Sequence, residues 1–187
     1  INAVTNSTVK ITDSSLTSSS GRVIFSRGGV SLQIEDTTIT GNSSEAALKL
    51  NDGTNLQISK STISGAKGGI SAVYNSTLRL QGGNSITNNQ GGIYLLNSTM
   101  HQYSDAGEST ISNNTGKEIQ AENSFMKLEG VTITGNRVSS EIDLRYGSIL
   151  MLGSGSSVTG TVTCGSTHPD NGTFVNDSGT TVTTSGC

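Results

Sequence analysis

Two glutamates, Glu118 and Glu141, are the side chains whose type and spacing best suit chemistry. They occupy equivalent positions in consecutive repeats, so their carboxylates would lie about 5 Å apart if the repeats stack. Asp143 and Glu122 are close by in the sequence. Paired carboxylates can share a cation or divide the roles of general acid and base. We favour the alternative, a solvated charged rim, because three basic residues accompany them: Lys117, Arg137 and Arg145.

The other candidate groups are two histidines and a row of cations. A Ser or Cys nucleophile needs a histidine within reach, and nothing pairs His101 or His168 with one, so we interpret both as surface or loop residues. The cations Lys10, Arg79 and Lys127 occupy outward positions of one strand series. They could contact an anionic glycan, but we favour a role in solubility and in preventing lateral strand pairing. The sequence therefore predicts no catalytic residue, no cofactor and no metal.

Hydroxyl side chains flank a central aliphatic residue in seven short segments. Because neighbouring residues of a strand point to opposite faces, both hydroxyls point outward where the aliphatic residue points inward. In stacked repeats they would form two columns with a spacing near 4.8 Å on a charge-free strip. These columns are our candidate binding face: Ser15, Thr17, Thr38, Thr40, Thr62, Ser64, Ser85, Thr87, Thr110, Ser112, Thr132, Thr134, Ser157 and Thr159.

Two interpretations of this hydroxyl strip stay open. Thr suits exposed strand positions without any special function, and this is the interpretation that we favour. The arrangement also resembles the Thr-x-Thr arrays of β-solenoid antifreeze proteins, which implies an ice-binding face. Five of the fourteen positions are Ser, which lacks the methyl group that helps to order surface water.

The seven segments belong to an internal repeat of 22 to 25 residues. Each repeat has an alternating apolar pair before the segment, such as Leu56 and Ile58, and another after it, such as Ile70 and Ala72. Alternation with period two indicates strands with one buried face. Three strands per repeat predict one coil of a three-sided solenoid, which must stack because a single coil cannot bury its inward row. Seven coils would form a rod roughly 34 Å long. The central residues are Leu16, Ile39, Ile63, Ile86, Ile111, Ile133 and Val158.

The chain must turn after each central segment. Gly41, Asn88, Asn113 and Gly135 lie there, and Gly and Asn tolerate the left-handed backbone of a sharp corner. The next residue is an asparagine in four coils. We predict that these side chains form a hydrogen-bonded ladder along the axis: Asn42, Asn89, Asn114 and Asn136. The fifth coil is longer, which predicts a bulging loop over 101–108.

The TITGN and ISNN turns and the asparagine ladder resemble those of the right-handed parallel β-helix superfamily of pectate lyases, polygalacturonases, phage tailspikes and autotransporter passengers. The resemblance covers roughly residues 6–164. It implies an all-β fold, a single-stranded right-handed parallel β-helix (a three-sided solenoid) of about seven coils. The Gly68-Gly69-Ile70 and Gly91-Gly92-Ile93 segments are also similar to the GGA(I/L/V) repeats of chlamydial polymorphic membrane proteins.

The enzymes of this superfamily cleave polysaccharides with clustered acidic residues. Their Asp-Asp, Gly-His-Gly and Arg-Ile-Lys motifs do not occur in this sequence. Because one fold hosts many functions, the resemblance implies the fold, and we expect a protein that is not an enzyme.

Composition and charge restrict the partners and the environment. The net charge of -3 and the lack of a basic stripe disfavour nucleic acid, and no apolar run is long enough to span a bilayer. Cys164 and Cys187 predict a disulfide, as expected in an oxidising compartment. The sequence starts at Ile1 without an initiator Met, which indicates a removed leader. We therefore expect a secreted or cell-surface protein.

The predicted organisation is a body of β-helix coils over residues 1–164 and a C-terminal cap or tail over residues 165–187, tied by the disulfide. The first coil has no evident cap, so an upstream domain or end-to-end self-association would cover it. Several Asn-x-Ser/Thr sites would accept glycans in a eukaryotic source: Asn6, Asn75, Asn97 and Asn171.

These observations favour a non-catalytic structural or adhesive binding module whose partner is an extracellular surface, a glycan or ice. One alternative is an ice-binding protein that uses the hydroxyl strip. A second is a divergent polysaccharide-active enzyme or a protein like a phage tailspike, in which Glu118 and Glu141 would act.

Overall fold

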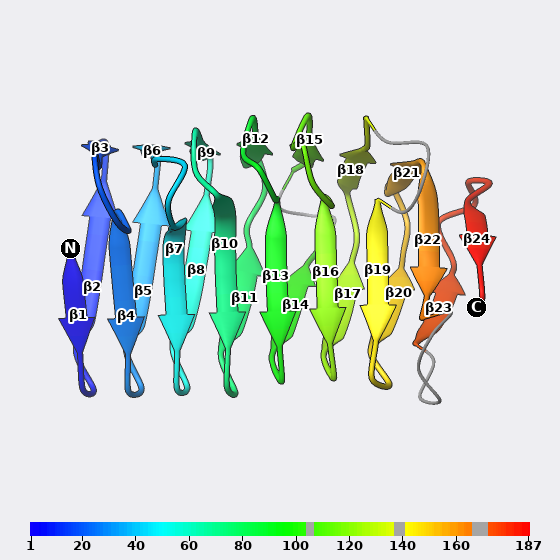
Figure 1. Ribbon diagram of the computed structural model, residues 1–187, viewed down its shortest axis with the longest axis horizontal. Helices are drawn as coiled ribbons and strands as arrows, with labels where there is room; N and C mark the ends of the chain where they lie inside the picture. The colour runs from blue at the N-terminus through cyan, green and yellow to red at the C-terminus, as the bar shows by residue number, and fades with distance from the viewer. Residues whose placement is uncertain (104–106, 137–140, 166–171) are drawn as a thin grey trace.

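The computed structural model describes residues 1–103, 107–136, 141–165 and 172–187, and in these ranges it consists of β-strands joined by turns. The strands wind into a rod with three parallel sheets along its length (Figure 1). Each complete coil contributes one strand to each sheet, so strands three apart in chain order are neighbours, except that β24 pairs with β22 in the last, partial coil. This confirms the predicted all-β, three-sided solenoid of about seven coils.

The three sheets are named here in the order in which each coil visits them. The first sheet comprises β1 (Asn2–Val4), β4 (Ile24–Arg27), β7 (Ala46–Asn51), β10 (Gly68–Val73), β13 (Ile93–Leu96), β16 (Ile119–Glu122), β19 (Ile142–Arg145), β22 (Thr161–Cys164) and β24 (Thr183–Ser185). The second sheet comprises β2 (Thr8–Thr12), β5 (Ser31–Glu35), β8 (Asn55–Ser59), β11 (Thr77–Leu80), β14 (Thr99–Gln102), β17 (Phe125–Leu128), β20 (Ile149–Leu152) and β23 (Thr173–Asn176). The third sheet comprises β3 (Ser15–Thr17), β6 (Thr38–Thr40), β9 (Thr62–Ser64), β12 (Ser85–Thr87), β15 (Ser109–Ser112), β18 (Val131–Thr134) and β21 (Ser157–Thr159).

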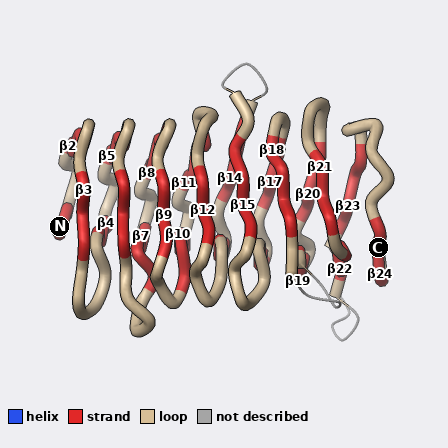
Figure 2. The backbone as a smooth tube through the Cα atoms, turned by 90° about the horizontal axis from the view of Figure 1, so that it is seen from above, coloured by secondary structure: helices blue, strands red, loops and turns tan. Residues whose placement is uncertain are grey.

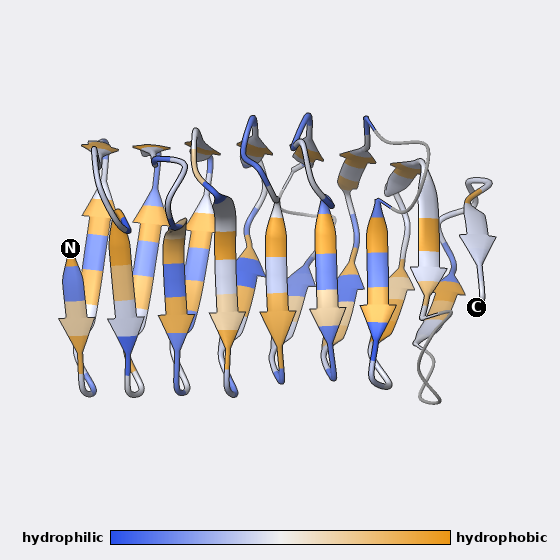
Figure 3. Cartoon of the chain, in the orientation of Figure 1, coloured by the Kyte–Doolittle hydropathy of each residue, from blue (hydrophilic) through white to orange (hydrophobic). Residues whose placement is uncertain are grey.

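The core is a set of aliphatic rows that run along the axis. In the third sheet, Ile39 pairs with Ile63 and Ile86 with Ile111, so the predicted central residues stack in register. The alternating pairs of the other two sheets also point inward, and the hydropathy bands in Figure 3 show this alternation along the strands. Each buried aliphatic side chain contributes about 1.5–3 kcal/mol, so the rows supply most of the stabilisation.

The corner between the second and third sheets (the second corner) is a tight turn with one left-handed residue, such as Asp36 (φ 47°) or Lys60 (φ 45°). The residue that follows points inward and bonds to the next coil: the amide nitrogen of Ser61 donates to Oδ1 of Asn84 at 3.2 Å, and that of Asn84 donates to Oγ of Ser109 at 3.3 Å. The tight turn therefore directs the side chain at this position into the rod and away from the outward hydroxyl strip.

The corner between the third and first sheets (the third corner) holds the predicted asparagine ladder, but in a shorter form. Asn89 donates from Nδ2 to Oδ1 of Asn114 at 3.0 Å, and both side chains are buried. Asn42 lies two coils away and bonds to the backbone oxygens of Ser18 and Gly21, and Asn136 is exposed. The four-membered ladder is therefore wrong: only Asn89 and Asn114 stack, because the coil between Asn42 and Asn89 has Ala66 at this position.

The turn residues at the third corner are required for two different reasons, backbone conformation and close packing. Asn88 (φ 57°) and Asn113 (φ 56°) have the predicted left-handed backbone. Gly41 does not; a Cβ atom there would lie 2.6 Å from Cβ of Ala66, so close packing between coils requires the glycine. The long fifth coil keeps His101 and Gln102 in β14, and its predicted loop therefore begins at Tyr103.

The described part of the C-terminal tail continues the rod instead of folding back over its end (Figure 2). β23 pairs with β20 and β24 pairs with β22. Cys164 and Cys187 form the predicted disulfide, with their Cα atoms 4.8 Å apart. The tail is therefore a further partial coil that is covalently attached to β22.

Candidate functional surfaces

The third sheet presents the hydroxyl strip. Its first column continues in register from coil to coil, and Thr38 pairs with Thr62, and Thr110 with Thr132. The column consists of Ser15, Thr38, Thr62, Ser85, Thr110, Thr132 and Ser157. These side chains are exposed or half-buried, so the column lies on the outer surface as predicted.

The strip is less uniform than the sequence pattern indicates. Ser112, in the second column, is only 8% exposed. The hydroxyl of Thr132 donates a hydrogen bond to the carboxylate of Glu108, which comes from the preceding long loop. The prediction of a charge-free strip is therefore wrong at the fifth and sixth coils, since local repeats do not show where an inserted loop will lie.

Glu118 and Glu141 are the largest departure from the sequence analysis. Both are completely buried, so the predicted solvated rim is wrong. In the equivalent positions of earlier coils the chain has Ala47, Gly69 and Gly92, which are also buried. Small residues at one position of three coils are the sequence signal that this position faces an enclosed corner.

The two buried glutamates have different neighbours. Asn114 donates to the Glu118 carboxylate from its backbone nitrogen at 3.1 Å and also from its side-chain amide. The Glu141 side chain fills space beside Gly135 and Gly160, where a Cβ atom on either glycine would overlap it. Burial raises the pKa of Glu118, the Asn114 hydrogen bonds oppose this, and the charge of Glu141 adds to the increase.

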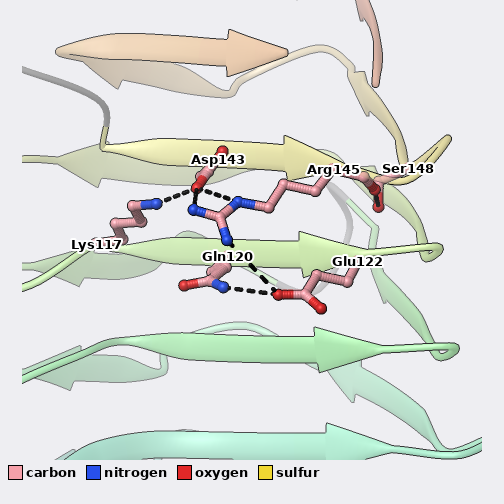
Figure 4. Close-up of polar contacts among 6 residues, drawn as sticks. All are labelled: Lys117, Gln120, Glu122, Asp143, Arg145 and Ser148. Atoms are coloured by element: carbon pink, nitrogen blue, oxygen red, sulfur yellow. Dashed lines mark hydrogen bonds and ion pairs between the residues drawn. The ribbon is translucent and has the colours of Figure 1, made fainter. Parts of the chain in front are cut away.

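Asp143 organises a charged cluster on the outer face of the first sheet (Figure 4). Its Oδ2 atom accepts from Nε of Arg145 at 2.8 Å and forms an ion pair with Nζ of Lys117. Glu122 accepts from Nε2 of Gln120 at 2.9 Å and lies 4.0 Å from Nη1 of Arg145. The Asp143 carboxylate therefore lies between two cations, Lys117 and Arg145. Asp143 itself is only 4% exposed.

A groove of about 480 Å³ lies beside this cluster, where β10, β13 and β16 begin. Its floor is shaped by glycines; at Gly116, a Cβ atom would overlap the carbonyl oxygen of Gln90. The polar side chains along it are Lys67, Ser71, Gln90, Tyr94, Lys117 and Gln120. Burial raises the pKa of Tyr94, and the nearby Glu122 carboxylate raises it further. No single repeat of the sequence indicates this groove, because its residues come from three coils.

His101 and the predicted cations lie on the outer face of the second sheet. His101 pairs in register with Arg79 on one side and Lys127 on the other. Burial lowers the pKa of His101, and the charges of Arg79 and Lys127 lower it further. The Nζ atom of Lys127 lies 3.0 Å from Oε1 of Glu129 and forms an ion pair with it. Lys10 occupies the same outward row, three coils before Arg79. Arg137, His168, Pro169 and Asn171 lie outside the described residues.

The described residues contain neither a metal-ligand cluster nor a membrane-spanning helix. No group of three or more metal-ligating side chains comes together there. No helix there is both long enough and apolar enough to cross a bilayer.

Comparisons with known proteins agree with this geometry at the level of the fold. A family model described as "Right handed beta helix region" matches residues 1–187, the whole chain. No curated protein and no solved structure matches.

Proposed function

Since the chain belongs to the family of right-handed β-helix proteins, we propose that it acts as a secreted or cell-surface module that binds an extracellular surface or glycan without catalysis. The observation that carries this proposal is the groove on the first sheet. A concave site with a few convergent polar groups is the usual form of a ligand site. Here the groups are two lysines, two glutamines, a tyrosine and a serine.

The groove is suited to binding rather than to turnover. Glycan hydrolysis needs one carboxyl group as an acid and a second as a base or nucleophile. The carboxylates beside this groove are held by cations and amides: Asp143 by Lys117 and Arg145, and Glu122 by Gln120. Glu118 and Glu141, which the enzyme hypothesis would use, are buried.

The disulfide between Cys164 and Cys187 supports the location outside the cell, because such bonds persist in oxidising compartments. The end strands of stacked parallel sheets can pair with a second copy of the same rod, so end-to-end self-association is part of this proposal. Dimers or filaments in negative-stain images would support self-association. Isolated particles at high protein concentration would overturn it.

The test is a glycan array and a turnover assay on the same purified protein. We expect binding without release of products, and Lys67→Ala should weaken it about tenfold, equivalent to about 1.4 kcal/mol. Lys10→Ala, a lysine on the second sheet, is the matched control and should bind like the wild type. Release of shortened oligosaccharides would overturn the non-catalytic proposal, and a blank array together with no adhesion to polysaccharide or cell surfaces would overturn binding.

One observation favours a second candidate, ice binding. The first hydroxyl column is in register over all seven strands of the third sheet, with a repeat near 4.8 Å. If this column orders water, the protein should shape ice crystals and produce thermal hysteresis, and Thr62→Lys should abolish both. Unchanged ice growth with the wild-type protein would end this candidate.

A further inference from the structure

A second groove, of about 470 Å³, follows the corner between the first and second sheets (the first corner) over four successive coils. It is separate from the groove of the first sheet: the two share no lining residue. Its rim on one side is a column of asparagines, and its other side is formed by the first outward residues of β11, β14, β17 and β20. These are Thr77, Thr99, Phe125 and Ile149, which pair in register.

The asparagine column consists of Asn75, Asn97 and Asn123. All three have left-handed backbones, with φ values of 62°, 47° and 45°. This conformation is open to Asn and Gly at low cost, and here the chain has Asn, which adds a donor and an acceptor. Asn123 donates from Nδ2 to Oδ1 of Asn97 at 2.7 Å. That bond uses one N–H of Asn123 Nδ2 and one lone pair of Asn97 Oδ1, so the side-chain Nδ2 of Asn97, Oδ1 of Asn123 and the side-chain amide of Asn75 can meet a ligand.

The floor of the groove is already satisfied internally. The buried hydroxyls of Ser76, Ser98 and Ser124 donate to backbone oxygens at 2.8, 2.9 and 2.8 Å. Ligand recognition therefore falls to the asparagine amides and to the hydroxyls of Thr77 and Thr99, which lie 3.3 Å apart. Successive rungs repeat at about 4.8 Å, so the asparagine amides of three coils and the threonine hydroxyls of two coils lie at regular steps along the axis.

The C-terminal part of the groove is apolar and continues into an aromatic cluster. Ile149 is 37% exposed, and Phe125 is half-buried with its ring 5.8 Å from that of His101. Tyr103 stacks parallel to His101 at 6.2 Å. Rings and aliphatic surfaces of this kind pack against the C–H faces of sugars, while amides and hydroxyls bond to their hydroxyl groups.

We propose that this first-corner groove binds an uncharged oligosaccharide lying along the axis of the rod, an inference that rests on the proposed function of the chain as a glycan-binding module. None of the described residues that line the groove is charged. A uronate or sulfated glycan would lose hydration there without gaining an ion pair, whereas a neutral chain loses little. The charged side chains of the same strands, Arg79 and Lys127, stand in the next outward row.

The test uses the whole chain, made in a bacterial host so that Asn75 and Asn97 stay unmodified. Neutral hexasaccharides of glucose and of mannose, and a hexasaccharide of galacturonic acid as the charged counterpart, are titrated by calorimetry. The variant Asn97→Gly/Asn123→Gly removes the amides but keeps the backbone conformation. It should bind the neutral chain at least about tenfold more weakly, equivalent to about 1.4 kcal/mol. Asn6→Gly, at the same corner (φ 50°) but outside the groove, should bind like the wild type.

The outcomes separate this inference from the proposed function. If Lys67→Ala removes neutral-sugar binding and Asn97→Gly/Asn123→Gly does not, the chain binds glycans through the first sheet and the first-corner groove is not the site. Binding of the galacturonate chain alone would overturn the inference in the same way. If the asparagine variant does not fold, Thr77→Val and Thr99→Val, which keep the side-chain shape, replace it and should show the same loss. Failure of every glycan and surface would overturn both proposals.

Discussion

The amide nitrogen of Glu118 donates a 2.9 Å hydrogen bond to the carbonyl oxygen of Glu141 one coil further along, and both side chains are closed off from solvent. Two carboxyl groups thus share the interior of the third corner. Burial raises the pKa of Glu118, and its neighbour raises it further. Because the folded state then binds its proton more tightly than the unfolded state, stability should depend on pH.

The sign of this dependence is opposite to that of a salt-bridged carboxylate. Below the ordinary pKa of about 4.5, Glu118 is protonated in both the folded and the unfolded state. It therefore causes no change of stability with pH in that range. As the pH rises from there through the raised folded-state pKa, the unfolded state loses its proton first, and stability falls. We expect Glu118→Gln to reduce the loss of stability between pH 4 and pH 8, measured by urea unfolding at each pH. The control is Glu45→Gln, since the Glu45 side chain is 43% exposed and pairs with Arg22. An equal loss in all three proteins would contradict the prediction.

The revised asparagine ladder makes a prediction about two asparagines that look equivalent in the sequence. Asn89 accepts from the backbone nitrogen of Ala66 and donates to backbone oxygens of Ile63 and Thr87. Asn89→Ala leaves these buried groups unpaired, which should cost about 2–3 kcal/mol. Asn136 is exposed, so Asn136→Ala should cost less than about 0.5 kcal/mol. Chemical denaturation measures the free energy of unfolding of both variants. Equal losses would contradict the two-membered ladder and favour the predicted four-membered one.

The charged cluster around Asp143 predicts an asymmetric response to mutation. Asp143→Asn leaves Lys117 and Arg145 close together without their shared counter-ion. Since both cations are about a third exposed, solvent screens part of the effect, and we expect a loss of about 1–2 kcal/mol. The added variant Lys117→Met should recover part of it. The result would be contradicted if Asp143→Asn were neutral at low salt.

The disulfide predicts a local effect at the C-terminal end. Cys187→Ser frees β24, which is held by its pairing with β22 and by this covalent bond. With 23 residues of separation, loop entropy gives a loss of about 3 kcal/mol. Hydrogen exchange should show that the protection of residues 173–185 decreases while that of Ile39 and Ile63 is unchanged. With reductant added, wild type and variant should behave alike; a remaining difference would show that the bond is not the cause.

The repeat by itself determined the fold and the inward rows of this protein. Strand alternation is a local property: once Ile39, Ile63 and Ile86 recur with one period, burial requires that they stack. The disulfide also followed from composition, because only two cysteines are present. Within each strand, the inward or outward direction of a side chain needs no tertiary information.

Corners and surfaces were decided by the tertiary structure. A side chain at a corner points in or out according to the length and handedness of the turn, and those depend on the coil stacked next to it. Glu118 and Glu141 are therefore buried, whereas Asn136, in a TITGN turn identical to that of Asn42, is exposed. Both grooves exist only because three or four coils lie in register, so their residues, such as Tyr94 with Lys67 or Asn97 with Asn123, form a surface that no single repeat contains.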